Sequence, residues 1–149
     1  MIKKIIVCVL LLSISFVQIA SAEEKFLSLK KNKVNVRDGP SFDSEIKFIY
    51  KKKNLPVKQI DKKENFRRIV DLKNNSGWIH VSQLKKPSSI ITLTEKILFK
   101  KPSNFSRPVA RLEKGRLLVV KKCQKNWCNI ITGNYTGWIK NNNVWGAIK

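Results

Sequence analysis

The sequence predicts an all-β protein in which two tandem small β-barrels follow an N-terminal signal peptide. Three observations favour this fold class. A short pattern returns after about 60 residues, apolar segments of strand length alternate with turn residues, and no stretch after residue 22 keeps a helical period of apolar residues. The 149 residues then divide into a signal and two modules, and we expect no separate catalytic domain.

The first 22 residues are expected to be a cleaved secretory signal. Lys3 and Lys4 form a basic start, residues 5–17 are mostly apolar, and Ala20-Ser21-Ala22 fits a cleavage site after Ala22. The apolar run is shorter than the ~20 residues that a membrane helix needs; an uncleaved anchor is the alternative. We therefore expect an exported protein, periplasmic or secreted, with no transmembrane segment in the mature chain.

The mature chain consists of two copies of one unit. The sequence S-G-W-I at 76–79 returns as T-G-W-I at 136–139, and Pro40-Ser41 returns as Pro102-Ser103. A short polar stretch lies between the copies, and its Pro87 disfavours a helix there. We expect a first barrel over 23–84, a linker over 85–92 and a second barrel over 93–149.

The apolar segments of both copies are expected to be strands. They are rich in Val, Ile, Phe, Tyr and Trp and are bounded by Gly and Asn, which adopt positive φ at little steric cost. In the first copy they are residues 33–37, 46–50, 55–61, 66–71 and 76–81. In the second copy they are residues 97–100, 109–112, 116–123, 127–132 and 135–140. Five short antiparallel strands in each copy favour a closed barrel, because closure removes edge strands.

The first copy contains V-N-V-R-D-G-P-S at 34–41 and G-W-I at 77–79, and it ends at Leu84. This pattern resembles the bacterial SH3-like (SH3b) domain family, with Asn54 at a turn where the family usually has Gly. The second copy has K-K-P-S at 100–103, so the arginine of the motif has no counterpart there. Over about 26–148 the chain resembles the small exported tandem SH3-domain proteins of alphaproteobacteria. The resemblance implies binding, often of cell-wall peptide, and no chemistry.

Cys123 and Cys128 are the two cysteines of the predicted mature chain. If Lys125-Asn126 form a two-residue hairpin turn, these cysteines face each other at a distance that a disulfide bridges. An oxidising compartment favours the bond. A redox pair is the first alternative, although the spacing is not C-x-x-C. A zinc site is the second, although it needs four ligands.

A candidate ligand groove is expected to include some of the exposed aromatic and charged residues. Trp78 and Trp138 follow glycine at the same place in both copies; they fit a barrel core, or a groove whose flat rings bind an extended peptide. Arg37 belongs to an expected structural turn and could also pair with a ligand carboxylate. The candidate residues are Arg37, Asp38, Tyr50, Trp78, His80 and Trp138.

The sequence predicts no enzyme. His80 is the only histidine, and nothing in the sequence identifies a nucleophile or an orienting group for it. No pair of carboxylates resembles a glycosidase dyad, and no G-x-S-x-G is present. We expect no catalytic residue, no metal and no cofactor.

The charge of the chain is strongly positive, +21 from 31 basic and 10 acidic residues. Lysines are spread over the whole chain, which fits an AT-rich coding bias as well as affinity for an anionic surface. Because the chain is expected to be exported, we expect no nucleic-acid partner. We expect a non-catalytic binding module, a monomer, whose ligand is cell-wall peptide (peptidoglycan) or another anionic envelope component. The alternative is a structural or protein-interaction factor that has an envelope protein as its partner.

Overall fold

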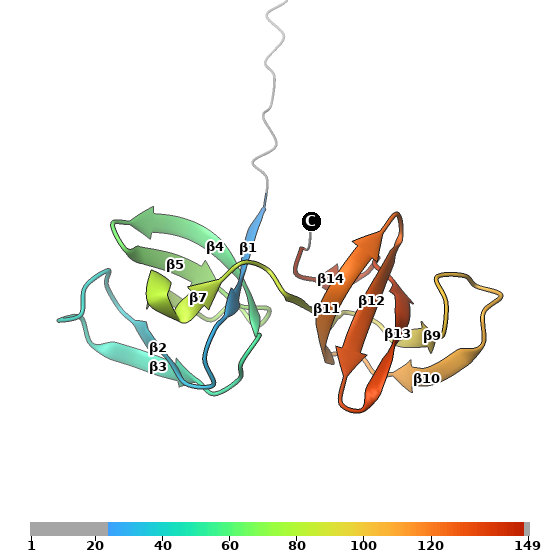
Figure 1. Ribbon diagram of the computed structural model, residues 1–149. Coiled ribbons are helices and arrows are strands. Elements are labelled where there is room, and N and C mark those ends of the chain that lie inside the picture. The colour runs from blue at the N-terminus through green and yellow to red at the C-terminus, as the bar shows by residue number, and fades with distance from the viewer. Residues whose placement is uncertain (1–23, 148–149) are drawn as a thin grey trace, which may run out of the picture.

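A computed structural model of the chain describes residues 24–147, which form two antiparallel sheets of seven strands each (Figure 1). The predicted signal and its cleavage after Ala22 lie outside the described residues. The first sheet contains β1 (Lys25–Leu29), β2 (Val34–Arg37), β3 (Ile46–Tyr50), β4 (Pro56–Lys63), β5 (Phe66–Val70), β6 (Ser76–His80) and β7 (Leu84–Lys85), with a 3-10 helix η1 (Val81–Gln83) between the last two. The second contains β8 (Ser89–Thr92), β9 (Lys96–Phe99), β10 (Pro108–Leu112), β11 (Leu117–Gln124), β12 (Trp127–Thr132), β13 (Tyr135–Lys140) and β14 (Val144–Trp145). The predicted all-β class of two tandem SH3-like barrels is confirmed.

The two sheets have the same topology. The strand order is β3-β2-β6-β5-β4-β1-β7 in the first and β10-β9-β13-β12-β11-β8-β14 in the second. Each sheet therefore has two edge strands, β3 and β7 in the first and β10 and β14 in the second. The sequence suggested closed barrels, which have no edge strands. The short β7 and β14 pair with β1 and β8 and do not extend the sheet to β3 or β10.

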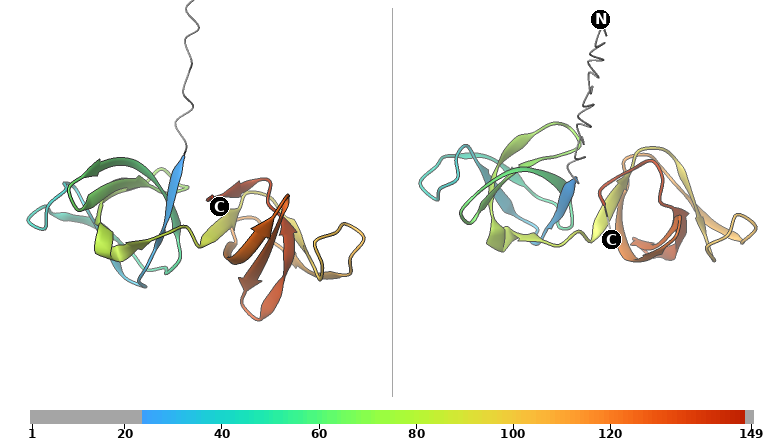
Figure 2. Two further views of the ribbon diagram at one scale, coloured as in Figure 1. Left: turned by 45° about the horizontal axis from the view of Figure 1, so that its top comes forward. Right: turned by 90° about the horizontal axis from the view of Figure 1, so that it is seen from above.

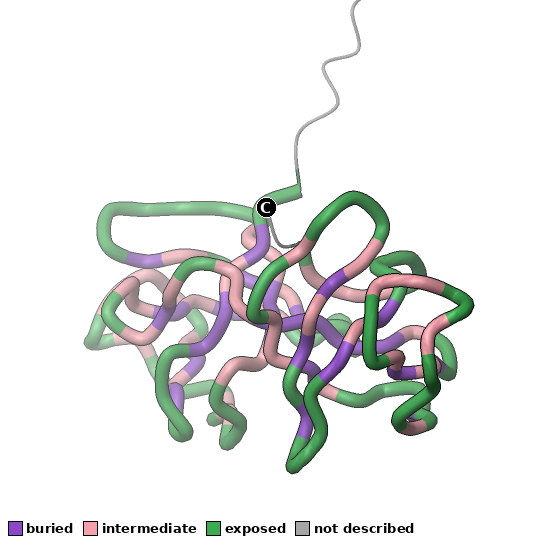
Figure 3. Tube along the Cα trace, turned by 45° about the vertical axis from the view of Figure 1, so that its right-hand side comes forward, coloured by how far each residue is buried: buried purple, intermediate pink, exposed green. Residues whose placement is uncertain are grey.

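Each sheet surrounds its own core. Buried and less buried residues alternate along its strands (Figure 3), because successive side chains of a strand point to opposite faces. The first core contains Leu29, Val34, Val36, Val57, Ile69, Ile79 and Leu84. The second contains Ile90, Leu98, Leu112, Leu118, Cys128, Ile130 and Ile139. Two separate clusters of buried residues match the two copies found in the sequence.

The glycine of each G-W-I motif lets two strands approach closely. A Cβ on Gly77 would lie 2.4 Å from Val36 Cγ1, and a Cβ on Gly137 would lie 2.6 Å from the Phe99 carbonyl oxygen. Since side chains alternate, the tryptophan after each glycine lies on the outer face, where it is half-buried. Neither Trp78 nor Trp138 belongs to a core cluster.

The ends of the predicted linker differ from the structure. Lys85 belongs to β7 and residues 89–92 form β8, so that residues 86–88 alone join the two sheets. The sequence did not indicate β8 as a strand, because Ser89 and Thr92 are polar. In the structure both are buried, and Thr92 Oγ1 donates a hydrogen bond to the Glu113 carbonyl at 2.8 Å. Strand β1 was missed in the same way, because Ser28 lies buried within it.

Positive φ occurs where the sequence placed turns. Asn54 has φ 65°, as its place in the resemblance suggested. Glu64 and Lys125 have φ 48° and 49° in the equivalent two-residue turns of the β4–β5 and β11–β12 hairpins. No helix within residues 24–147 has the length and apolar character needed to cross a membrane.

Candidate functional site

Three rings from separate elements form a cluster on the first barrel. Phe42 lies in the β2–β3 loop, Phe66 begins β5, and His80 ends β6. The ring centroids are 5.3 Å apart for Phe42 and Phe66, 4.8 Å for Phe42 and His80, and 5.2 Å for Phe66 and His80. Phe66 is buried, whereas Phe42 is 61% exposed. The cluster therefore offers an apolar surface with a fixed base and an open top.

Arg37 holds the loop that carries the exposed ring. Its Nη1 donates hydrogen bonds to the carbonyl oxygens of Phe42 at 3.0 Å and Ser44 at 2.8 Å. Its guanidinium also lies 5.7 Å from the centre of the Phe42 ring. Asp38 follows with an exposed side chain, and its N–H donates to the Glu45 carbonyl. The structural turn expected for this motif is present, with Arg37 bonded to its own loop.

His80 has a local hydrogen-bond partner besides its ring contacts. Its Nδ1 lies 2.8 Å from Ser82 Oγ and accepts a hydrogen bond from the Ser82 N–H at 3.3 Å, which caps η1. The imidazole is thus held in one orientation against Phe42 and Phe66. This orientation suits a wall of a binding surface.

Tyr50 is not part of the cluster. Its hydroxyl donates a hydrogen bond to Asp71 Oδ2 at 3.0 Å, and the Asp71 carboxylate also accepts from the backbone N–H groups of Lys73 and Asn75. Burial, with the charge of Asp71 as a second cause, raises the pKa of Tyr50 far above its ordinary value. Tyr50, a candidate groove residue from the sequence, therefore stabilises the fold at the β5–β6 turn.

The second barrel has a pocket at the equivalent place. Trp127 opposes Lys140 in the β12–β13 register, as Phe66 opposes His80 in the β5–β6 register. Trp127 packs against Phe99 with ring centroids 5.6 Å apart, and Lys140 Nζ lies 5.9 Å from its ring centre. The pocket has a volume of about 400 Å³ and is lined by Asn104, Asn126, Trp127, Lys140, Asn141 and Asn142.

Two polar contacts position the wall of this pocket. Asn141 Nδ2 donates a hydrogen bond to the Lys125 carbonyl at 3.3 Å, and Lys96 Nζ donates to Asn142 Oδ1 at 3.0 Å. Burial, and then the charge of Lys140, lowers the pKa of Lys96. Lys96 belongs to β9, and the equivalent strand of the first barrel, β2, contributes residues to the core. The ammonium group of Lys96 contacts the pocket wall at Asn142.

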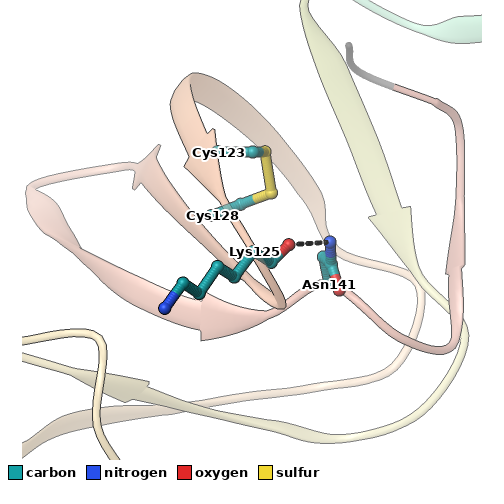
Figure 4. Close-up of a disulfide and its surroundings, with 4 residues drawn as sticks. All are labelled: Cys123, Lys125, Cys128 and Asn141. Carbon is teal, nitrogen blue, oxygen red and sulfur yellow. Dashed lines mark hydrogen bonds between the residues drawn. A yellow bond between two sulfur atoms is a disulfide. The ribbon is translucent and has the colours of Figure 1, made fainter.

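The disulfide fixes the hairpin that forms the other side of the pocket. Cys123 opposes Cys128 and Gln124 opposes Trp127, which confirms the register predicted from the sequence. The two sulfurs are bonded, with a Cα–Cα distance of 4.1 Å (Figure 4). The hairpin tip between them contributes Asn126 to the pocket, so the covalent link constrains the pocket as well as a strand pair.

The two tryptophans of the G-W-I motifs lie beside these sites. Trp78 pairs with Arg37 across β6 and β2, and Trp138 pairs with Phe99 across β13 and β9. Lys122 Nζ lies 5.6 Å from the centre of the Trp138 ring. Each tryptophan thus extends the outer face next to its own barrel's site.

The structure brings together Arg37 and His80 of the predicted groove, with Trp78 and Asp38 adjoining. Trp138 belongs to the second site and Tyr50 to neither. Phe42 was missed, although a large apolar residue after Pro40-Ser41 in a polar loop is a signal that the sequence offers. The corresponding loop of the second barrel carries Phe105, whose side chain is fully exposed.

Metal ligands do not gather in the described part of the chain. Among residues 24–147, no group of three or more His, Cys, Asp and Glu side chains is placed to hold a metal ion.

The chain is similar to known proteins at the level of its domains. The family model of the bacterial SH3 domain matches residues 30–86 and 94–146. The solved structure of NlpC2 from Trichomonas vaginalis is 13% identical over 81% of this chain and 47% of that chain, with a TM-score of 0.39. NlpC1 from the same organism is 14% identical over 84% and 46%, also with a TM-score of 0.39. The chain spans about half the length of these two structures, and no curated protein matches it at a significant level.

Proposed function

The chain belongs to the bacterial SH3 domain family, and from this premise we propose that it is a non-catalytic, exported binding module of the cell envelope whose ligand is cell-wall peptide. One observation carries the proposal: Phe42 is exposed on a rigid base of Phe66 and His80. Flat rings held in place bind an extended peptide with little loss of side-chain entropy.

The charges around both sites suit a ligand with carboxylates. Lys140 flanks Trp127 in the second barrel, and Arg37 flanks Phe42 in the first. Wall peptides carry free carboxylates, which pair with such cations. The overall charge of +21 adds a diffuse attraction to anionic surfaces that salt screens.

The residues at the sites support a role without catalysis. His80 is occupied by its contacts with Ser82 and the two phenylalanine rings. The second site has Lys140 in its place. The equivalent positions of the two barrels, His80 and Lys140, therefore do not hold the same candidate general base.

A second candidate function is an interaction with an envelope protein. The terminal strands β3 and β10 carry exposed apolar side chains, Ile46, Ile49 and Val109. A partner strand adds readily to such an edge, with main-chain hydrogen bonds for affinity. This alternative places the ligand on the strand edge and not on the ring cluster.

Sedimentation with purified peptidoglycan at low and high salt tests the proposal. We expect the chain without residues 1–22 to pellet with the wall material, and the ring-dependent part of the retention to persist in salt. Phe42→Ala should reduce that part, whereas Ile60→Ala, which removes another exposed apolar side chain, should not. Absence of pelleting at low salt contradicts wall binding; release of peptide or dye from cell walls contradicts the non-catalytic assignment.

A further inference from the structure

The two barrels are joined by a specific junction. Trp145 of β14 lies against Phe26 of β1, with ring centroids 5.1 Å apart and planes at 89°. Its indole N–H donates a hydrogen bond to the Pro56 carbonyl of β4 at 3.1 Å. Phe26 is buried. The last strand of the second barrel is therefore packed on the first barrel.

A chain of hydrogen bonds runs through the same junction. The Ser88 N–H donates to Ser28 Oγ at 3.0 Å, and Ser28 Oγ lies 3.2 Å from Ser89 Oγ. Ser89 Oγ in turn donates to the Asn54 carbonyl. With Ser28 donating to Ser89, the hydroxyls of Ser28 and Ser89 each donate once and accept once. Ser28 and Ser89 are buried, and buried polar groups that are satisfied in one geometry hold that geometry.

The junction leaves little freedom between the sheets. Residues 86–88 alone separate β7 from β8. Gly146 follows Trp145 with φ 114°, and a Cβ there would lie 2.9 Å from the Ser89 carbonyl oxygen. The short connection, the ring pair and the bonded hydroxyls of Ser28 and Ser89 together favour one rigid body of two barrels.

The candidate sites lie at opposite ends of this body. The β2–β3 loop, with Phe42, and the β9–β10 loop, with Asn104, mark the two ends in every view of Figures 1 and 2. The junction and both cores lie between them. The two sites are therefore separate surfaces of the molecule.

The two ends have the same kind of chemistry. The first presents Phe42 beside Arg37, and the second presents Trp127 beside Lys140. Each combines an aromatic face with a cation, so each suits the same anionic peptide. The second adds the amide side chains of its pocket.

We propose that the protein binds two cell-wall chains at once, one at each end, and holds them as a rigid cross-link. This rests on the function proposed above, because both sites are assigned the same wall ligand. A wall polymer repeats its peptides, so a bivalent body clusters wall fragments, whereas a body with one working site only coats them.

The experiment measures binding and clustering separately, on purified peptidoglycan fragments mixed with the chain lacking residues 1–22. Pelleting reports binding, and light scattering of the suspension reports clustering. We expect Phe42→Ala and Trp127→Ala each to keep pelleting through the other end and to lower clustering about tenfold. Both substitutions leave the net charge unchanged, and Ile60→Ala serves as the matched control that keeps full clustering.

Each result decides the proposal. Pelleting of the unaltered chain without clustering overturns the cross-link and leaves wall binding intact. Clustering by either single-site variant at the unaltered level also overturns it. Absence of pelleting overturns the proposed function and the cross-link together. Circular dichroism confirms the fold of each variant, and Lys140→Gln, at an exposed side chain, repeats the test if Trp127→Ala is unfolded.

Discussion

The hydroxyl of Tyr50, at the end of β3, donates a hydrogen bond to Asp71 Oδ2 in the β5–β6 turn, 3.0 Å away. The same carboxylate accepts the N–H groups of Lys73 and Asn75 at 2.8 and 2.9 Å. One buried acid thus organises its own turn and ties it to a strand from another hairpin. This bond makes the fold depend on the protonation of a phenol.

We expect Tyr50→Phe to lower the free energy of unfolding by about 1 kcal/mol at neutral pH, because Asp71 loses a donor. The pKa of Tyr50 is raised in the folded state above the ordinary 10.0. Above that pH the unfolded chain loses the proton and the folded chain keeps it, so stability falls as pH rises. Urea unfolding up to about pH 11 should show a shallower fall for Tyr50→Phe. Tyr135→Phe, at a half-exposed ring, is the control, and equal slopes for both variants contradict the prediction.

The glycines of the two G-W-I motifs should tolerate no side chain. Gly77→Ala places a methyl group 2.4 Å from Val36 Cγ1, and Gly137→Ala places one 2.6 Å from the Phe99 carbonyl oxygen. Each should cost about 2 kcal/mol or more through overpacking, measured by urea unfolding. Gly115→Ala meets no atom within 4 Å and, at φ 82°, should cost about 1 kcal/mol. A larger loss at Gly115 than at Gly77 would show that backbone strain and not close packing governs these positions.

Removal of the disulfide should weaken the second barrel. The closed loop is short, so the double substitution Cys123→Ala and Cys128→Ala should lower the free energy of unfolding by about 2 kcal/mol. A reductant should lower the melting temperature of the unaltered chain and leave that of the double variant unchanged. Two reactive thiols in the oxidised chain without residues 1–22 would refute the bond.

The junction should depend on the indole of Trp145. Trp145→Phe removes the N–H donated to Pro56 and should cost about 1 kcal/mol. Trp145→Ala also removes the contact with Phe26 and should cost about 2 kcal/mol. Small-angle scattering should show a broader range of overall dimensions for Trp145→Ala, with unchanged circular dichroism. Dimensions identical to those of the unaltered chain would mean that the serine seam alone keeps the barrels together.

The ten strands with clear apolar patterns were predictable from the sequence, and so was the pairing of Cys123 with Cys128. Strands β1 and β8 were not, because Ser28 and Ser89 satisfy their hydroxyl groups across a junction that brings together residues 61 positions apart. The local sequence pattern around either serine does not reveal a contact with a residue so far away in the sequence. The linker prediction at 85–92 included β8 for the same reason.

The candidate site was predictable in part. Arg37 and His80 were named from the motif, but the partner that makes them a surface, Phe42, depends on a loop bent by the hydrogen bonds of Arg37. Tyr50 was also named as a candidate, whereas its hydroxyl bonds to Asp71 in a turn that is distant in the sequence. In both cases the role of the residue depends on contacts between separate elements, which the sequence pattern does not show.

The rigid connection over residues 86–88 has a consequence for wall architecture. On the cross-link proposal, two binding ends that cannot approach each other act as a spacer. Such a molecule joins pairs of wall chains at one separation and leaves closer or wider pairs unjoined. The length of the body, and not the affinity of either end, then determines which chains in a mesh become neighbours.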